Sequence, residues 1–149
     1  MATYVPDMET QAIARNLMRR YSYLLGELNI EKIGFLKELD SPSKTKLAVT
    51  KRVDGATKIY YSDKDYIIIF FDQRWQELTP AQRNILVLHE LMHCQADGES
   101  MRAHDVQDFY EIAAAFGADW CFNPTVRDPL GEEKVDLISK PANYGDEES

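Results

Sequence analysis

Residues 79–98 read TPAQRNILVLHELMHCQADG and contain the strongest helix signal of the chain. Thr79 followed by Pro80 is typical of a helix start, because threonine can cap free backbone N–H groups and proline fits the first helical position. Asp97 and Gly98 form a stop signal, so we expect a helix from Pro80 to about Ala96. Its apolar residues are Ile85, Leu86, Leu88, Leu91 and Met92. They cover more than one narrow stripe, which predicts a helix buried against a sheet.

Upstream of this helix, residues 31–71 have the composition of β-strands. Short runs rich in Ile, Val, Tyr and Phe are separated by turn-forming groups such as Asp54-Gly55. This pattern predicts an antiparallel meander of three or four strands. The most apolar run, Tyr66 to Phe71, predicts a strand with both faces at least partly covered.

Two more helices are predicted, one on each side of this central region. From about Asp7 to Leu28 the apolar residues recur at steps of three and four, and Asp7 is a candidate N-cap. Asp105 followed by Asp108 is a weak relative of a capping box and predicts a third helix that reaches Trp120. The aromatic residues expected in the core are Trp75, Phe109, Phe116 and Trp120.

These patterns predict an α+β fold with an N-terminal helix, a small mostly antiparallel sheet, the helix at 80–96 and a third helix. After Asn123 the composition shifts to proline, glycine and acidic residues. Residues 124–149 hold seven acidic and three basic side chains, so their net charge of −4 is half of the chain's formal net charge of −8. We expect one domain over residues 1–123 and an acidic, partly flexible tail that stays outside the core. As an alternative, Val135, Leu137 and Ile138 could dock as one short segment.

The composition of the 149 residues, with a pI near 4.9, excludes several classes of protein. Direct nucleic-acid binding is not expected, because a general binder of phosphate backbones needs a basic surface. No run approaches the roughly 18 to 20 apolar residues of a membrane helix, and we expect neither a membrane segment nor export. Cys94 and Cys121 suggest no disulfide framework, which fits a reducing compartment such as the cytoplasm.

All three histidines fall between positions 89 and 104, and two of them belong to the sequence HELMH at residues 89–93. On a helix, imidazoles four residues apart project from the same face, so His89 and His93 can bind one metal ion. Glu90 can take a proton from a metal-bound water without coordinating the metal itself. This HExxH spacing predicts the chemistry of a zinc hydrolase, and its alternative is a chance match on histidines without a metal.

A catalytic zinc usually has three protein ligands and one position for water. His104 is the candidate third ligand, because an antiparallel return after the turn at residues 97–98 would bring it beside the first pair. The rival oxygen ligands are Glu99, Glu111, Asp105 and Asp108.

Asp105 and Asp108 have two further possible roles. Each could accept a hydrogen bond from the second ring nitrogen of a metal-binding histidine, or each could cap the third helix. Cys94 adjoins His93 but is expected on a different face of the helix, as a core residue or a spectator.

These motifs resemble a known family. HELMH at 89–93, with Trp75, the LTPAQ helix entrance at 78–82 and HDVQDF at 104–109, resembles the phage metallopeptidase domain family over about residues 9–122. The resemblance implies a minimal zincin-like fold, related to SprT-like zinc peptidases. It also implies that His89, His93 and His104 are zinc ligands and that Glu90 is the catalytic base. If a phage encodes the chain, the expected compartment is the host cytoplasm.

We therefore expect a Zn²⁺-dependent metallopeptidase that acts on a protein or peptide substrate. Zincins commonly bind the substrate antiparallel to the strand before the active helix, and Tyr66 to Phe71 has that place in the order of elements. The same run is equally typical of a core strand. The candidates for a second electrophile are Tyr60, Tyr61, Arg102 and Tyr110, and their spacing selects none of them.

Two alternative functions remain at this point. One is a zinc hydrolase that acts on a bond other than a peptide. The other is a zinc-containing binding protein without activity, whose acidic surface engages a basic partner or mimics nucleic acid. Glu90 between two correctly spaced histidines favours an enzyme, because a purely structural site needs no base there.

Overall fold

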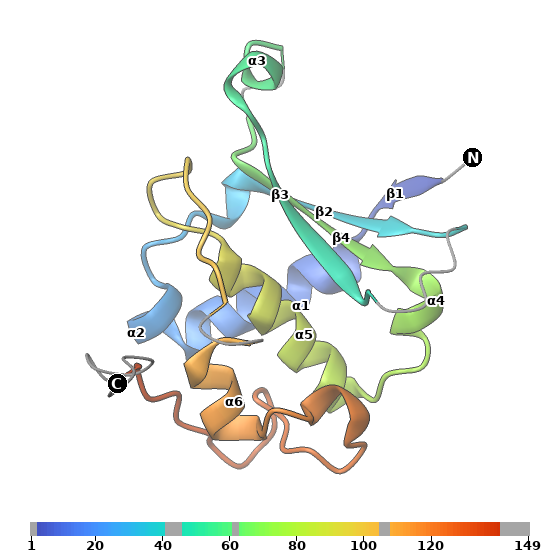
Figure 1. Ribbon diagram of the computed structural model, residues 1–149, viewed down its shortest axis with the longest axis vertical. Helices are drawn as coiled ribbons and strands as arrows, with labels where there is room; N and C mark the ends of the chain where they lie inside the picture. Colours follow the sequence, from blue (N-terminus) through green and yellow to red (C-terminus); the bar gives the residue numbers. More distant parts are fainter. Residues whose placement is uncertain (1–2, 41–45, 61–62, 105–107, 141–149) are drawn as a thin grey trace, which may run out of the picture.

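The computed structural model describes residues 3–40, 46–60, 63–104 and 108–140. These residues form an α+β fold, as predicted, in which helices pack against one small mixed sheet (Figure 1). Within them, no helix combines the length and the apolar composition that crossing a membrane requires.

The sheet has four strands in the order β1-β2-β4-β3. Their bounds are β1 (Tyr4–Pro6), β2 (Ile33–Glu38), β3 (Ala48–Arg52) and β4 (Tyr66–Phe71). The pairs β1/β2 and β3/β4 are antiparallel, whereas the central pair β2/β4 is parallel.

The predicted meander is wrong, because consecutive strands are neighbours in a meander, whereas β4 lies between β2 and β3. The strand at 66–71 itself is confirmed, and it takes the central position, where Ile68 and Phe70 are fully buried. Turn residues mark where strands end, but the burial of apolar faces decides which strands pair. The most apolar strand therefore lies in the middle of the sheet.

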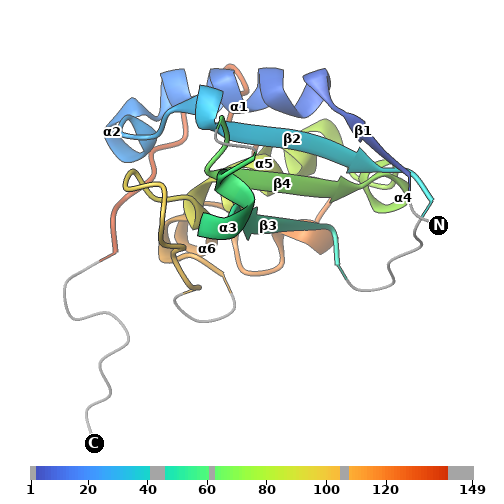
Figure 2. The same cartoon turned by 90° about the horizontal axis from the view of Figure 1, so that it is seen from above.

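The N-terminal helix, α1 (Met8–Arg20), begins as predicted and ends earlier. The Asp7 carboxylate accepts a hydrogen bond from Thr10 N at 3.0 Å and caps the helix. Tyr21 then leaves the helical conformation, and a short second helix, α2 (Ser22–Leu25), follows. Figure 2 shows α1 running alongside β2, against which it packs.

Helix α5 (Pro80–His93) has the predicted start. The Thr79 hydroxyl accepts a hydrogen bond from Gln82 N at 3.2 Å, and the Gln82 side chain accepts one from Thr79 N at 2.9 Å, which completes a capping box. The helix ends earlier than predicted, because Cys94 has extended backbone angles and pairs with Met101 in a β-bridge. The chain therefore leaves the helix directly after the second histidine of HExxH.

The third helix, α6 (Tyr110–Phe116), is shorter than predicted. Gly117 follows it with φ +90°, a left-handed conformation that favours glycine. Trp120 lies beyond it in the short 3-10 helix η2 (Trp120–Phe122). The remaining elements are η1 (Ile30–Lys32), α3 (Gly55–Lys58), which projects from the body in Figure 1, and α4 (Asp72–Trp75).

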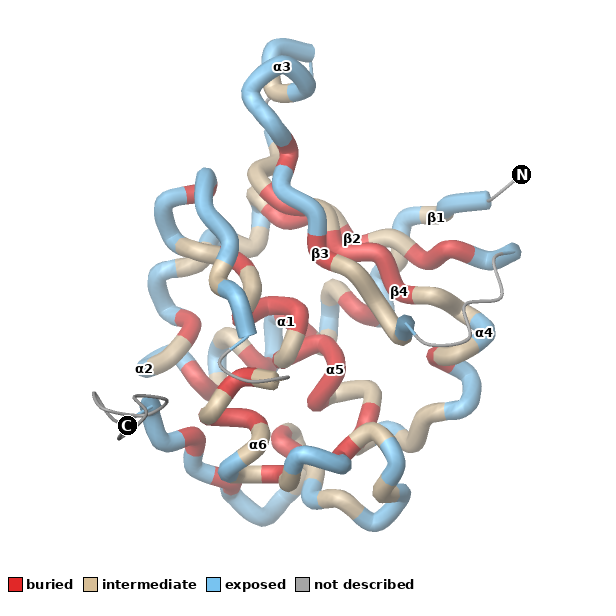
Figure 3. Tube along the Cα trace, viewed as in Figure 1, coloured by how far each residue is buried: buried red, intermediate tan, exposed pale blue. Residues whose placement is uncertain are grey.

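The core lies between the sheet and the helices α1 and α5, where buried residues concentrate (Figure 3). Every aromatic residue that the sequence predicts for the core is buried, namely Trp75, Phe109, Phe116 and Trp120. Cys94 is buried as well, and neither it nor Cys121 forms a disulfide.

The C-terminal segment contributes to this core. Val135 and Leu137 are only 2% and 3% exposed, whereas Ile138 is 69% exposed. The Tyr21 hydroxyl donates a hydrogen bond to Pro129 O at 2.8 Å and fixes the segment to α1. The expectation that the segment stays outside the core is therefore wrong, and the alternative of a docked short segment holds for two of its three residues.

This docking follows from burial, because Val135 and Leu137 join the core and Val126 and Leu130 pack against it. A division of the chain into a domain over residues 1–123 and a tail over 124–149 stays a prediction.

Candidate metal centre

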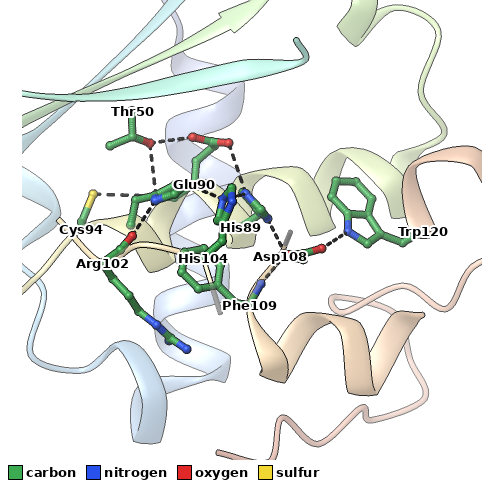
Figure 4. A network of polar contacts seen from close by, with 10 residues as sticks. Thr50, His89, Glu90, Cys94, Arg102, His104, Asp108, Phe109 and Trp120 are labelled. Atoms are coloured by element: carbon green, nitrogen blue, oxygen red, sulfur yellow. Dashed lines mark hydrogen bonds and ion pairs between the residues drawn. The ribbon is translucent and has the colours of Figure 1, made fainter. Parts of the chain in front are cut away.

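The three histidines meet beside the end of α5, where Figure 4 shows His89 and His104 side by side. Their ligand atoms lie within 4.8 Å of one another. His104 Nε2 lies 3.0 Å from His89 Nε2 and 3.1 Å from His93 Nε2. Nitrogens bound to one tetrahedral zinc at about 2.0–2.1 Å are roughly 3.3 Å apart, so the spacing suits a single metal ion.

The tautomers of the two helical histidines also suit a metal. His89 Nδ1 donates to Asp108 Oδ1 at 2.7 Å, and His93 Nδ1 donates to Arg102 O at 2.8 Å. A carboxylate and a carbonyl oxygen can only accept, so each Nδ1 carries a proton, and in the neutral ring Nε2 is then the nitrogen with the lone pair. Because both of these Nε2 atoms lie close to His104 Nε2, the neutral rings present the donor set of a cation site.

The ring of Phe109 holds the three imidazoles from one side. Its centroid lies 5.1 Å from that of His89, 5.0 Å from that of His93 and 5.2 Å from that of His104. Burial lowers the pKa of His93 to about 4, against the opposing hydrogen bond to Arg102 O. This ring is therefore neutral at pH 7, which is the form that binds a metal.

Asp108 orients His89 and does not cap α6. Its carboxylate accepts hydrogen bonds from His89, from Phe109 N and from the indole of Trp120, each at 2.7 Å. Burial alone would raise the pKa of Asp108, but these hydrogen bonds outweigh it, and the pKa is lowered. Helix α6 has no side-chain cap at its first turn. The companion candidate, Asp105, lies outside the described residues.

Glu90 lies in the wall of the site and is 5% exposed. Its Oε2 lies 4.0 Å from His89 Nε2, and its Oε1 accepts a hydrogen bond from the Thr50 hydroxyl at 2.7 Å. Burial raises the pKa of Glu90 above its ordinary value, while His89 and the Thr50 hydroxyl oppose that rise. A glutamate with a raised pKa is a stronger base than one in water.

A comparison with protein-family models matches residues 2–130 to the family described as "Putative phage metallopeptidase". The chain belongs to this family. The matched range includes both motifs that carry the resemblance, HELMH and HDVQDF. A search of the curated proteins and a search of the solved structures find no match. Membership of the phage metallopeptidase family and a three-histidine cluster that could hold a metal support each other.

Of the rival oxygen ligands, Glu99 and Glu111 do not belong to the cluster of ligand atoms that the three histidines form. Glu111 is buried and forms an ion pair with Arg102, with 2.9 Å between Nη2 and Oε1. Glu99 is exposed, and its carbonyl accepts a hydrogen bond from Arg52 at 2.6 Å. Cys94 is buried, and burial raises the pKa of its thiol to about 12. This thiol is a poor metal ligand, because it stays protonated.

The loop that carries His104 is held by the sheet. Tyr66 of β4 accepts a hydrogen bond from Gln95 N at 3.2 Å and donates to Ser100 O. The Asp97 carboxylate accepts hydrogen bonds from the backbone N–H groups of Glu99 and Ser100, at 2.8 and 3.0 Å. Arg102 N then bonds to His93 O at 2.9 Å, so the loop returns along the end of α5, as the sequence predicts.

Three residues near the centre have contacts that the sequence does not reveal. Thr50, which holds Glu90, lies forty residues before it on the edge strand. Trp120, which donates to Asp108, follows it outside any motif. From the sequence, Phe109 is predicted only as a core residue. An apolar residue at a core position or a threonine in a strand gives no local signal of such a partner. Only the packing of α5 against β3 and η2 brings these groups together.

A cavity of about 570 Å³ opens beside the histidines. His89, Glu90, His104 and Asp108 line it at the metal centre. Among the candidate electrophiles, Tyr110 lines this cavity, whereas Tyr60 is 84% exposed and Arg102 is paired with Glu111. Tyr61 lies outside the described residues.

Proposed function

We propose that this member of the phage metallopeptidase family is a zinc-dependent peptidase in which His89, His93 and His104 bind the metal and Glu90 is the base. The convergence of three Nε2 atoms, with a buried carboxylate 4.0 Å from one of them, carries the proposal. Three imidazole ligands and one open position are the ligand set of catalytic zinc, and imidazole suits zinc better than magnesium or calcium.

Zinc held by the three rings would supply a Lewis acid that polarises the scissile carbonyl and makes a water acidic near pH 7. The chain's own residues transfer the proton and position the groups of the site. Glu90 accepts a proton from the attacking water and passes it to the leaving amine. Thr50 holds Glu90 Oε1, so Oε2 is the oxygen that faces His89 and the metal position. Asp108 and the Arg102 carbonyl keep the imidazoles in the binding tautomer.

The peptide is proposed to bind along β3. The strand expected for this role, β4, has a neighbour on each side and offers no free edge, so that expectation is wrong. In the described part of the chain β3 is an edge strand, and it also packs against α5. The β3/β4 ladder includes the bonds Val53 N to Asp65 O and Phe71 N to Leu47 O. By the alternation of an antiparallel ladder, the backbone groups of Ala48, Thr50 and Arg52 face the outer side, where a substrate strand can pair.

Metal analysis combined with a Glu90→Gln variant tests the proposal. We expect one Zn²⁺ per wild-type chain and cleavage of a library of unstructured peptides, followed by mass spectrometry. Glu90→Gln should keep the zinc and lose turnover by at least about 100-fold. Glu99→Gln, which changes an exposed acid of the neighbouring loop, is the control and should behave as wild type.

Each other outcome has a definite meaning. Absence of stoichiometric metal, or full turnover by Glu90→Gln, would overturn the proposal. Zinc bound by the wild-type chain without any cleavage would favour the binding protein without activity. Cleavage of a non-peptide ester or amide alone would favour a zinc hydrolase of another class.

A further inference from the structure

We infer that the cavity beside the metal centre binds a large apolar side chain of the substrate, that of the residue directly after the scissile bond. The inference rests on the proposed peptidase function and adds the substrate preference. It follows from the chemistry of the cavity wall and from the direction of strand β3.

The far part of the cavity is apolar. Leu86 of α5 and Trp120 of η2 form its buried wall, at 3% and 5% exposure. Ala113 and Ala118 are small and leave the space open, and Phe122 lines the cavity with 82% of its surface exposed. Because the Phe122 ring is exposed and lines the cavity, its apolar surface is free to contact a substrate side chain.

Charge is confined to the metal centre. Of the described residues that line the cavity, the ionised or metal-binding ones are His89, Glu90, His104 and Asp108. The other described residues of its lining include no lysine, arginine or further carboxylate. A charged substrate side chain would lose its water there without gaining a partner, whereas an apolar one gains from burial. At about 570 Å³ the cavity has the size of pockets that hold whole small ligands, so it accepts large side chains such as those of Leu, Met and Phe.

The direction of β3 decides which substrate residue enters. β3 runs from Ala48 to Arg52, and Leu47 and Ala48 at its beginning line the cavity. Thr50, in the middle of the strand, contacts Glu90 and so marks the level of the scissile bond. Antiparallel pairing is the more stable arrangement, and a substrate that pairs in this way runs from Arg52 towards Ala48. The residue after the bond therefore lies at the cavity, and the residues before it lie towards Arg52.

The first test is the cleavage pattern of the zinc-loaded chain on a randomised peptide library. We expect Leu, Met or Phe to be enriched directly after the cut and Asp, Glu and Lys to be excluded. Cleavage with no preference at that position would overturn the inference and leave the peptidase function standing. A preference at the residue before the cut would overturn the antiparallel direction. No cleavage of any peptide would overturn the peptidase function itself, so the two failures are distinct.

The second test uses exposed residues, whose substitution leaves the core unchanged. Phe122→Ala should raise KM about tenfold for a peptide with Phe after the cut, with kcat nearly unchanged, and should not affect a peptide with Ala there. Tyr60→Ala is the matched control, because Tyr60 is an equally exposed aromatic residue that does not line the cavity. Equal effects of both variants would contradict the assignment of Phe122.

A binding measurement makes the result independent of turnover. Zinc-loaded Glu90→Gln should bind a fluorescent peptide with a central Phe about tenfold more tightly than the same peptide with a central Asp. Ala113→Leu, which fills the cavity from α6, should remove most of that difference. Equal affinities of Glu90→Gln for the two peptides would overturn the inference.

Discussion

Arg102 and Glu111 form an ion pair that joins the loop carrying His104 to helix α6, with 2.9 Å between Nη2 and Oε1. The Arg102 guanidinium also lies 4.5 Å from the ring centroid of Phe109, which packs against all three imidazoles. Its backbone carbonyl accepts the Nδ1–H of His93 at 2.8 Å. One residue therefore positions both a ring that comes from the helix and the loop that brings the third ring.

Arg102→Met is expected to weaken zinc binding by about tenfold, because the His104 loop loses its fixed place against α6 while all three rings remain. Competition with a chromophoric chelator measures this affinity. Arg127→Met is the control, since Arg127 pairs with Glu133 on the exposed surface and should leave the affinity unchanged. An equal affinity for wild type and Arg102→Met would show that the ion pair does not position the site.

Asp108→Ala should lower zinc affinity by roughly 10-fold to 100-fold, the usual cost of removing the partner of a metal-binding imidazole. Asp108→Asn should lower zinc affinity less, because its amide oxygen can still accept the hydrogen bond from His89 Nδ1. Chelator competition compares the two variants. Identical losses would mean that the charge of Asp108, and not its hydrogen bond, acts on the site.

Thr50→Val keeps the shape of the side chain and removes the hydroxyl that holds Glu90 Oε1 at 2.7 Å. We expect kcat to fall about tenfold, which corresponds to the loss of one hydrogen bond, and zinc affinity to stay as in wild type. Steady-state kinetics together with zinc content separate the two effects. A fall in zinc content would assign Thr50 to the metal site instead of the base.

Zinc should stabilise the folded chain, because the three-ring site exists only in that state. At a free zinc concentration about 100 times Kd, the free energy of unfolding should rise by about 2.7 kcal/mol over that of the metal-free chain. His104→Ala should remove most of this rise while changing the metal-free stability little, because His104 is exposed. Urea unfolding with and without a chelator measures both quantities.

The anchoring of the C-terminal segment predicts a loss of stability at alkaline pH. Burial raises the pKa of Tyr21 above its ordinary value of 10.0, against the opposing charge of Arg20. Because the pKa is raised in the folded state, the protonated Tyr21 hydroxyl makes its full contribution to the free energy of unfolding below pH 10. This contribution is lost as the pH rises beyond 10. Tyr21→Phe removes the hydrogen bond to Pro129 O and should lower the free energy of unfolding by about 1 kcal/mol at neutral pH. Above pH 10 the free energy of unfolding of this variant, measured by urea unfolding, should fall less steeply with pH than that of wild type. Equal slopes of the free energy of unfolding against pH for the two proteins would contradict this role of Tyr21.

Several elements follow from the sequence because their causes are local. Asp7 and Thr79 cap helices through bonds to residues three positions later, and those bonds depend only on nearby geometry. The spacing of His89 and His93 places both rings on one helix face whatever surrounds that helix. The HExxH helix, the strand at 66–71 and the return of the loop towards α5 can therefore be predicted without coordinates.

The rest depends on contacts between residues far apart in the chain, and no local pattern specifies them. The parallel pairing of β2 with β4 and the docking of Val135 and Leu137 result from which apolar faces bury each other. The contact of Thr50 with Glu90 follows from that sheet order, because it places β3, and not β4, beside α5. The sequence by itself determined which side chains could bind a metal. Tertiary packing decided which groups orient them and which strand edge and cavity lie beside them, because these depend on the burial of whole elements and not on the spacing of residues.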